Sequence, residues 1–165
     1  MTELQYRALG DFKANGRTVS GTIVAYGDVA RLPNGFETFR PGSIVYDDVR
    51  LNVQHDKGRI LARTGAGVEL FDSPTKLELR ATLPETREAD DVLTLLKSNV
   101  LRGLSAEFHI VKAHHQGVST RVIDKAELVG VGIVDNPAYG ASTVEARAEL
   151  QRKVKPVRVR RFRWL

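Results

Sequence analysis

The chain has 165 residues, of which 42% are hydrophobic, so it is long enough for one domain with a single core. It contains no cysteine, which excludes a disulfide framework, a thiol nucleophile and thiolate metal sites. The net charge of +5 resides in the last 19 residues: residues 147–165 carry a net +7, and the other 146 residues carry a net −2. A body this close to neutral is not the strongly basic surface that is typical of nucleic-acid-binding domains.

The N-terminus shows no export signal. Residues 1–17 include Glu3 and Asp11 and lack the basic start and apolar run of a signal peptide. No stretch of about 18 apolar residues occurs that could cross a membrane. We therefore expect no membrane partner and a cytoplasmic location.

The first half of the chain alternates short apolar runs with turn residues. Segments 18–26 and 49–54 are rich in β-branched and apolar residues and predict strands. Between them, Leu32-Pro33-Asn34-Gly35 and Arg40-Pro41-Gly42 predict an ordered loop or a wide hairpin. Further strands are predicted at 60–63, 67–71 and 76–83, the last with strict apolar and polar alternation.

The second half predicts one clear helix and two longer strands. Residues 87–99 combine an apolar stripe with acidic residues in the first turn and Lys97 in the last, as a helix dipole favours. Strands follow at 104–112 and 121–134, and a second helix is expected to begin near Ser142 or Thr143. The prediction is a mainly β fold: a single closed or nearly closed β-barrel with one or two peripheral helices. We divide the chain into an N-terminal extension at 1–16, a barrel domain at 17–146 and a basic tail at 147–165.

Two segments could carry chemistry. His55 ends a strand before Lys57-Gly58, where the chain must turn, and a histidine at such an address can act as a general base. Period-two alternation after Gly103 places Ser105 and Glu107 on the face opposite to Ala106. Each residue alone is more often an ordinary surface or half-buried polar group. His114 and His115 are adjacent in a probable turn and form no four-ligand set, so neither a metal nor a cofactor is expected.

Four segments in order carry a resemblance to a known family: Phe39-Arg40-Pro41-Gly42-Ser43, Asn52-Val53-Gln54-His55-Asp56, Arg102-Gly103-Leu104-Ser105-Ala106-Glu107-Phe108 and the stretch 128–139. Together they resemble the prohead, or capsid-maturation, serine proteases of tailed bacteriophages and gene transfer agents, which are distant relatives of the herpesvirus assemblins. The resemblance covers roughly residues 17–145. It implies an assemblin-like β-barrel hydrolase in which Ser105 is the nucleophile and His55 the general base.

The third catalytic residue follows less directly from the resemblance. Assemblins place it on the strand after the serine, and the acid at the corresponding place here is Glu127. Many family members carry a Glu in the stretch occupied by Gly130-Val131-Gly132, so the acid has either moved or is missing. Glu107 is the rival, because it shares a strand face with Ser105. The oxyanion hole is not identified, since assemblins use a basic stretch where this chain has Asp135-Asn136-Pro137.

The resemblance also implies a biological setting. The substrate would be the scaffolding segment of the major capsid protein, and the enzyme itself, inside procapsids assembling in the host cytoplasm. The resemblance leaves a homodimer open, and it implies that the tail 147–165 is flexible or removed by self-cleavage. Two other functions compete: an inactive capsid-assembly or scaffold protein on the same fold, and nucleic-acid binding through the tail with its Phe162 and Trp164.

Overall fold

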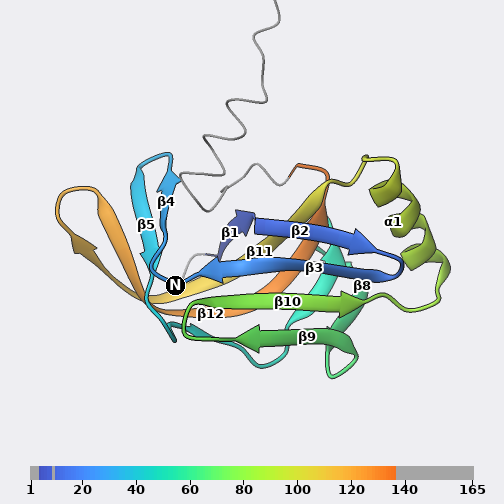
Figure 1. The fold of residues 1–165 in the computed structure, drawn as a ribbon, viewed down its shortest axis with the longest axis horizontal. Helices are drawn as coiled ribbons and strands as arrows, with labels where there is room; N and C mark the ends of the chain where they lie inside the picture. Colours follow the sequence, from blue (N-terminus) through green and yellow to red (C-terminus); the bar gives the residue numbers. More distant parts are fainter. Residues whose placement is uncertain (1–3, 9, 137–165) are drawn as a thin grey trace, which may run out of the picture.

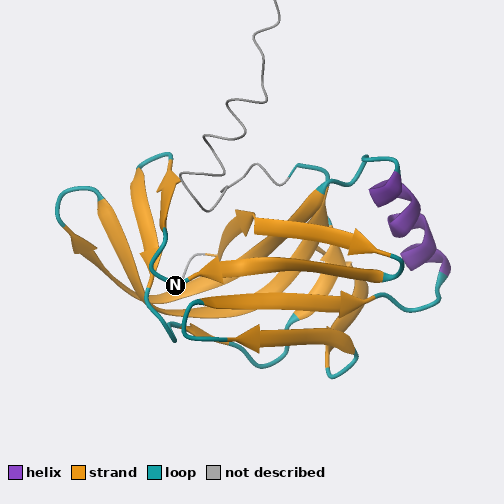
Figure 2. Cartoon of the chain, in the orientation of Figure 1, coloured by secondary structure: helices purple, strands orange, loops and turns teal. Residues whose placement is uncertain are grey.

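The computed structural model describes residues 4–8 and 10–136, which form twelve strands and one helix (Figures 1 and 2). The strands are β1 (Leu4–Ala8), β2 (Gly10–Asn15), β3 (Thr18–Ala25), β4 (Val29–Leu32), β5 (Gly35–Phe39), β6 (Ile44–Val45), β7 (Arg50–Val53), β8 (Asp56–Thr64), β9 (Gly67–Asp72), β10 (Lys76–Thr82), β11 (Gly103–Gln116) and β12 (Thr120–Val134). The helix is α1 (Arg87–Lys97). The tail 147–165 and the helix expected near Ser142 lie outside the described residues.

All strands belong to one sheet with the order β1-β11-β12-β7-β8-β9-β10-β3-β2, and β5 and β6 pair in parallel with β12. The sheet curls over its own inner face, so that β2, β3, β10 and β9 lie in front of β11 and β12 (Figure 1). The predicted mainly β fold is confirmed, but the sheet does not close into the closed or nearly closed barrel that the sequence predicts. Among the described residues, the end strands β1 and β2 pair with β11 and β3 rather than with each other, which leaves a curled open sheet.

The core lies between the two halves of the curled sheet. Its largest fully buried apolar side chains come from β3, β7, β10, β11 and β12 or their flanks and include Ile23, Leu51, Leu79, Leu104, Phe108 and Ile133. Helix α1 packs at one end of the sheet through Ala89, Val92 and Leu93 and is capped at its start by Thr86. At the opposite end, the β4–β5 hairpin and the outer part of the β11–β12 hairpin extend away from the body (Figure 2).

Two strands, β1 and β2, lie within the segment 1–16 that was expected to be an N-terminal extension. β1 pairs along its whole length with β11, and β2 pairs with β3, so both strands belong to the sheet. The segment between residues 27 and 49 was expected to be an ordered loop or a wide hairpin. It contains strands, of which β4 and β5 form a hairpin. No helix among the described residues is long and apolar enough to span a membrane.

Candidate active site

His55 lies in a two-residue turn between β7 and β8. Val53 pairs with Asp56, and Gln54 and His55 both have positive φ, 54° and 58°. This is the backbone of a type I′ turn, which normally takes Asn-Gly or Gly-Gly. Non-glycine residues held in the left-handed region cost on the order of 1–3 kcal/mol each and occur preferentially at functional sites. The strained turn therefore fixes the direction in which the imidazole leaves the backbone.

Gln54 anchors this turn to the end of β12. Its backbone N–H donates to the carbonyl of Ile133 at 2.9 Å, and its side-chain Oε1 accepts from the backbone N–H of Asp135 at 3.2 Å. A hydrogen bond with the Gln54 side chain also holds the pKa of the Asp135 carboxyl below its usual value. The sequence did not reveal this anchoring by Gln54, because the tight turn at Gln54-His55 is not visible in the local pattern.

Ser105 and Glu107 lie on one face of β11, while Ala106 and Phe108 lie on the other. Phe108 is fully buried and its ring centroid is 5.5 Å from that of Phe39, so the second face packs in the core. This is the alternation that the sequence predicts. However, Ser105 and Glu107 are each only 5% exposed, so their face is covered here rather than open to water.

The neighbouring strand β12 offers glycine at both positions opposite these side chains. Ser105 is paired with Gly132 and Glu107 with Gly130, and directly opposed residues of antiparallel strands point to the same face. A Cβ atom on Gly132 would lie 2.8 Å from both Cε1 and Nδ1 of His55 and 3.0 Å from its Nε2. The imidazole thus occupies the space that a side chain at position 132 would fill, beside Ser105.

Glu107 is the carboxylate that contacts the histidine. Its Oε1 lies 2.5 Å from Nδ1 of His55, so Nδ1–H donates to the carboxylate and Nε2 is the remaining ring nitrogen. A Cβ on Gly130 would lie 3.5 Å from Oε2 of Glu107, which is an ordinary van der Waals distance, so position 130 lies directly beside this carboxylate.

Glu127, the acid chosen from the sequence, does not occupy this position. Its Cα is paired with those of His109 on β11 and Val45 on β6, and its side chain is exposed. It lies instead on the wall of a groove of about 300 Å³ that also reaches Glu107, Asn52 and Lys57. Irregularities in the β11–β12 register just after Glu107 contribute to this placement, and the sequence pattern does not reveal them.

No group of three or more described residues could hold a metal ion. His114 pairs instead with Asp124, whose carboxylate lies 2.6 Å from the imidazole Nδ1, and this bond together with one from Arg40 lowers the pKa of Asp124. A serine, a histidine and a carboxylate therefore converge on one face of β11 and β12, and these groups suffice for nucleophilic chemistry.

A mainly β fold with a serine, a histidine and a glutamate on one sheet face defines the class of β-rich proteins equipped for serine hydrolase chemistry. The family model of the caudovirus prohead serine proteases matches residues 2–157. The chain belongs to this family. No curated protein matches the chain.

The fold is also similar to a solved structure. The capsid assembly protease of bacteriophage T4 aligns with a TM-score of 0.53 and 11% sequence identity, over 82% of this chain and 98% of that one. At this identity the likeness concerns the fold alone.

Proposed function

We propose that this protein is the serine endopeptidase of a maturing procapsid, with Ser105 as nucleophile, His55 as general base and Glu107 as the acid that orients it. The observation that supports this most directly is the place of the imidazole. It lies over Gly132, the cross-strand partner of Ser105, and its Nδ1 faces Glu107. In this proposal Nε2, the other ring nitrogen, takes the proton of the Ser105 hydroxyl.

The chemistry follows from these positions. Ser105 Oγ attacks the scissile carbonyl carbon while its proton passes to His55 Nε2, and a tetrahedral intermediate forms. The charge that develops on the imidazolium is stabilised by the Glu107 carboxylate. The imidazolium then protonates the leaving amine, which departs as the C–N bond breaks. Water, deprotonated by the same imidazole, hydrolyses the acyl-enzyme and restores the Ser105 hydroxyl.

The proposed substrate is the scaffolding segment of the major capsid protein, together with the enzyme's own chain. Family membership and the capsid assembly role described for the T4 protein support this setting, with action inside assembling procapsids. Self-cleavage would remove part or all of the tail 147–165. Intact-mass analysis of mature particles should then show a shortened chain, and a full-length chain in those particles would contradict the processing.

An inactive scaffold protein was the alternative, partly because Gly130 and Gly132 replace the expected acid. Gly132 makes room for the His55 ring, and Glu107 supplies a carboxylate at His55 Nδ1, so the glycines in this stretch no longer favour loss of activity. The proposed activity is therefore favoured over an inactive role on the same fold.

A fluorophosphonate probe tests the proposal, since it labels an activated serine. Labelling should disappear in Ser105→Ala and His55→Ala and persist in Ser43→Ala. Ser43 is a matched control because it is also a buried serine, and its hydroxyl has no hydrogen-bond partner among the described residues. Coexpression with the cognate capsid protein should give trimming by the wild type and by Ser43→Ala only. Equal trimming by Ser105→Ala would refute the proposed nucleophile.

A further inference from the structure

Asn52 lies on β7 in the same row of the sheet as Ser105. Ser105 is paired with Gly132 across β11 and β12, and Gly132 is paired with Asn52 across β12 and β7. Paired residues of neighbouring strands point to the same face, so the side chains of Asn52 and Ser105 share a face. Leu51 and Val53, on either side of Asn52 in the chain, are buried in the core and point the other way. Asn52 is thus on the candidate active-site face.

The His55 ring lies between these two side chains. It occupies the space above Gly132, where a Cβ would lie 2.8 Å from Nδ1 and Cε1 of the ring. Neighbouring strands are about 4.8 Å apart, so the Cα atoms of Asn52 and Ser105 are about 10 Å apart. The ring covers the strand that separates them, so Asn52 lies on the side of the imidazole that is away from Ser105.

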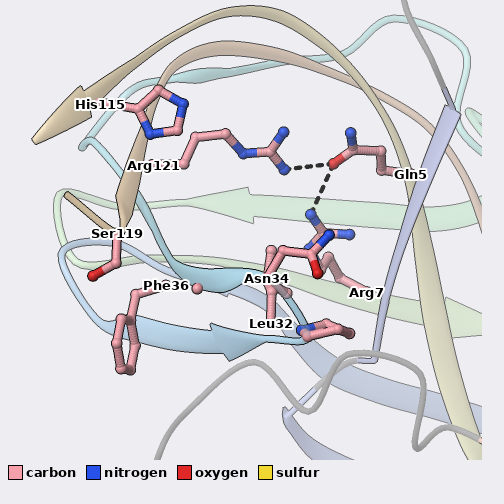
Figure 3. Close-up of a pocket in the computed structure, with 10 residues that line it drawn as sticks. Gln5, Arg7, Leu32, Asn34, Phe36, His115, Ser119 and Arg121 are labelled. Atoms are coloured by element: carbon pink, nitrogen blue, oxygen red, sulfur yellow. Dashed lines mark hydrogen bonds between the residues drawn. The ribbon is translucent and has the colours of Figure 1, made fainter.

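The side-chain oxygen of Asn52 is buried without a hydrogen bond. Only 4% of Asn52 is exposed, and its Oδ1 has no hydrogen-bond partner among the described residues. By contrast, the fully buried carboxylate of Glu37 accepts hydrogen bonds from both Arg7 and Arg121. Gln5 Oε1 accepts from the same two arginines in a pocket of about 410 Å³ (Figure 3). An unpaired buried acceptor lowers stability, so the chemistry around Asn52 explains its presence better than the fold does.

The groove of about 300 Å³ beside Glu107 indicates which way this oxygen points. The groove reaches Asn52, and its lining includes Ile60, the partner of Asn52 on β8. The described residues that line it do not include Gly132 or His55. Because Oδ1 is shielded from solvent, it is not the atom of the amide that faces the groove. The direction left to Oδ1 is toward Gly132 and the imidazole above it.

We propose that Asn52 Oδ1 faces the His55 ring and stabilises the imidazolium that forms when the ring takes the proton of Ser105. This role, which rests on the proposed function, makes Asn52 a positioning residue that acts through His55. A general base is neutral at rest and offers Oδ1 only weak C–H contacts, whereas the imidazolium carries a full positive charge. The interaction therefore strengthens in the transition state, where a fixed dipole shielded from water lowers the barrier.

The test uses the full chain and a small alkyl fluorophosphonate at a series of concentrations. Asn52→Leu removes the oxygen and keeps the branching of the side chain. Its maximal labelling rate should fall by about tenfold with the half-saturating probe concentration unchanged, because the lost interaction is made only in the transition state. Its melting temperature should not fall, since no buried acceptor is left unpaired. A purely structural role predicts the reverse: a lower melting temperature and an unchanged labelling rate of the folded protein.

Thr38→Val is the matched control, because it also removes a buried side-chain oxygen that has no hydrogen-bond partner among the described residues. Thr38 lies on β5, outside the candidate active site, and its variant should be labelled at the wild-type rate. If Asn52→Leu fails to fold, Asn52→Val decides the question, since it also lacks the amide and valine suits a strand.

Equal maximal labelling rates of the folded Asn52 variant and Thr38→Val overturn the proposal. So does a higher half-saturating concentration with an unchanged maximal rate, since it would assign Asn52 to ligand binding. A wild-type protein that is not labelled at all refutes the proposed function itself, and the role of Asn52 with it.

Discussion

The space above Gly132 offers a sharp test of the catalytic arrangement, because the smallest possible change should disturb it. Gly132 has no positive φ, so alanine is compatible with its backbone, and alanine in a strand would by itself stabilise by about 0.5–1 kcal/mol. The added methyl group would lie 2.8 Å from Nδ1 and Cε1 of His55, whereas ordinary contacts are near 3.5–4 Å. The imidazole must therefore move by roughly 0.7–1.2 Å.

The ring has little room to absorb this shift. Glu107 holds Nδ1, and the backbone at Gln54 and His55 is fixed in the left-handed region. A displacement of about 1 Å in a catalytic group costs on the order of 100-fold in rate. We expect Gly132→Ala to lose about 100-fold in fluorophosphonate labelling rate and in peptide cleavage, while its melting temperature changes by only a few degrees.

Gly130→Ala is the matched control. Its Cβ would lie 3.3 Å from the carbonyl oxygen of Arg50 and 3.5 Å from Glu107 Oε2, so small adjustments accommodate it. Its labelling rate should fall by less than about fivefold, since only the supporting carboxylate is approached. A folded Gly132→Ala that is labelled at the wild-type rate, or equal losses in the two variants, would refute the placement of His55 as the base beside Ser105.

Three further changes have distinct outcomes. Glu107→Gln should lower the labelling rate by about 10²–10⁴-fold, because the amide cannot stabilise the imidazolium of His55. The labelling rate of Glu127→Gln should stay within about threefold of the wild-type rate. A larger loss in Glu127→Gln than in Glu107→Gln would restore Glu127 as the acid. Asn99→Gly should raise the free energy of unfolding in urea by about 0.5 kcal/mol, since Asn99 has φ 60° after the end of α1; a loss of stability would contradict this. Burial and the hydrogen bond to a carboxylate raise the pKa of Tyr26, so the folded state favours its neutral form. This contribution to stability is complete below the unfolded pKa of about 10 and is lost as the pH rises above that pKa. Tyr26→Phe should therefore flatten the pH dependence of the melting temperature above about pH 10. An unchanged slope would exclude Tyr26 as the source of that pH dependence.

The sequence pattern gave most of the central elements to within a few residues. The predicted helix 87–99 is α1, and the predicted strands 76–83 and 121–134 are β10 and β12. These segments carry their own signals, since alternation, apolar stripes and caps are local properties. The strands β1 and β2 were missed, and β4 and β5 were expected only as one of two alternatives, because the composition of these segments is mixed; β1 in addition pairs with β11, which is distant in the chain.

The choice of the acid shows a limit of a different kind. Period-two alternation already placed Glu107 on the face of Ser105, but the resemblance to assemblins favoured the following strand and hence Glu127. The contact between Glu107 and His55 requires a turn on β7–β8 to reach across β12 at a glycine. Neither the left-handed turn nor the strand order that brings β7 beside β12 is visible in the local sequence.

The sequence alone determined the class of fold, the order of His55 before Ser105 and the family to which these segments pointed, because each depends on short segments and their order. The tertiary structure decided that the sheet stays open, that Glu107 faces His55, and that Arg7 and Arg121 meet around Glu37. These three results depend on which strands become neighbours and in which register. That choice is made by the burial of the whole core, which no single segment encodes.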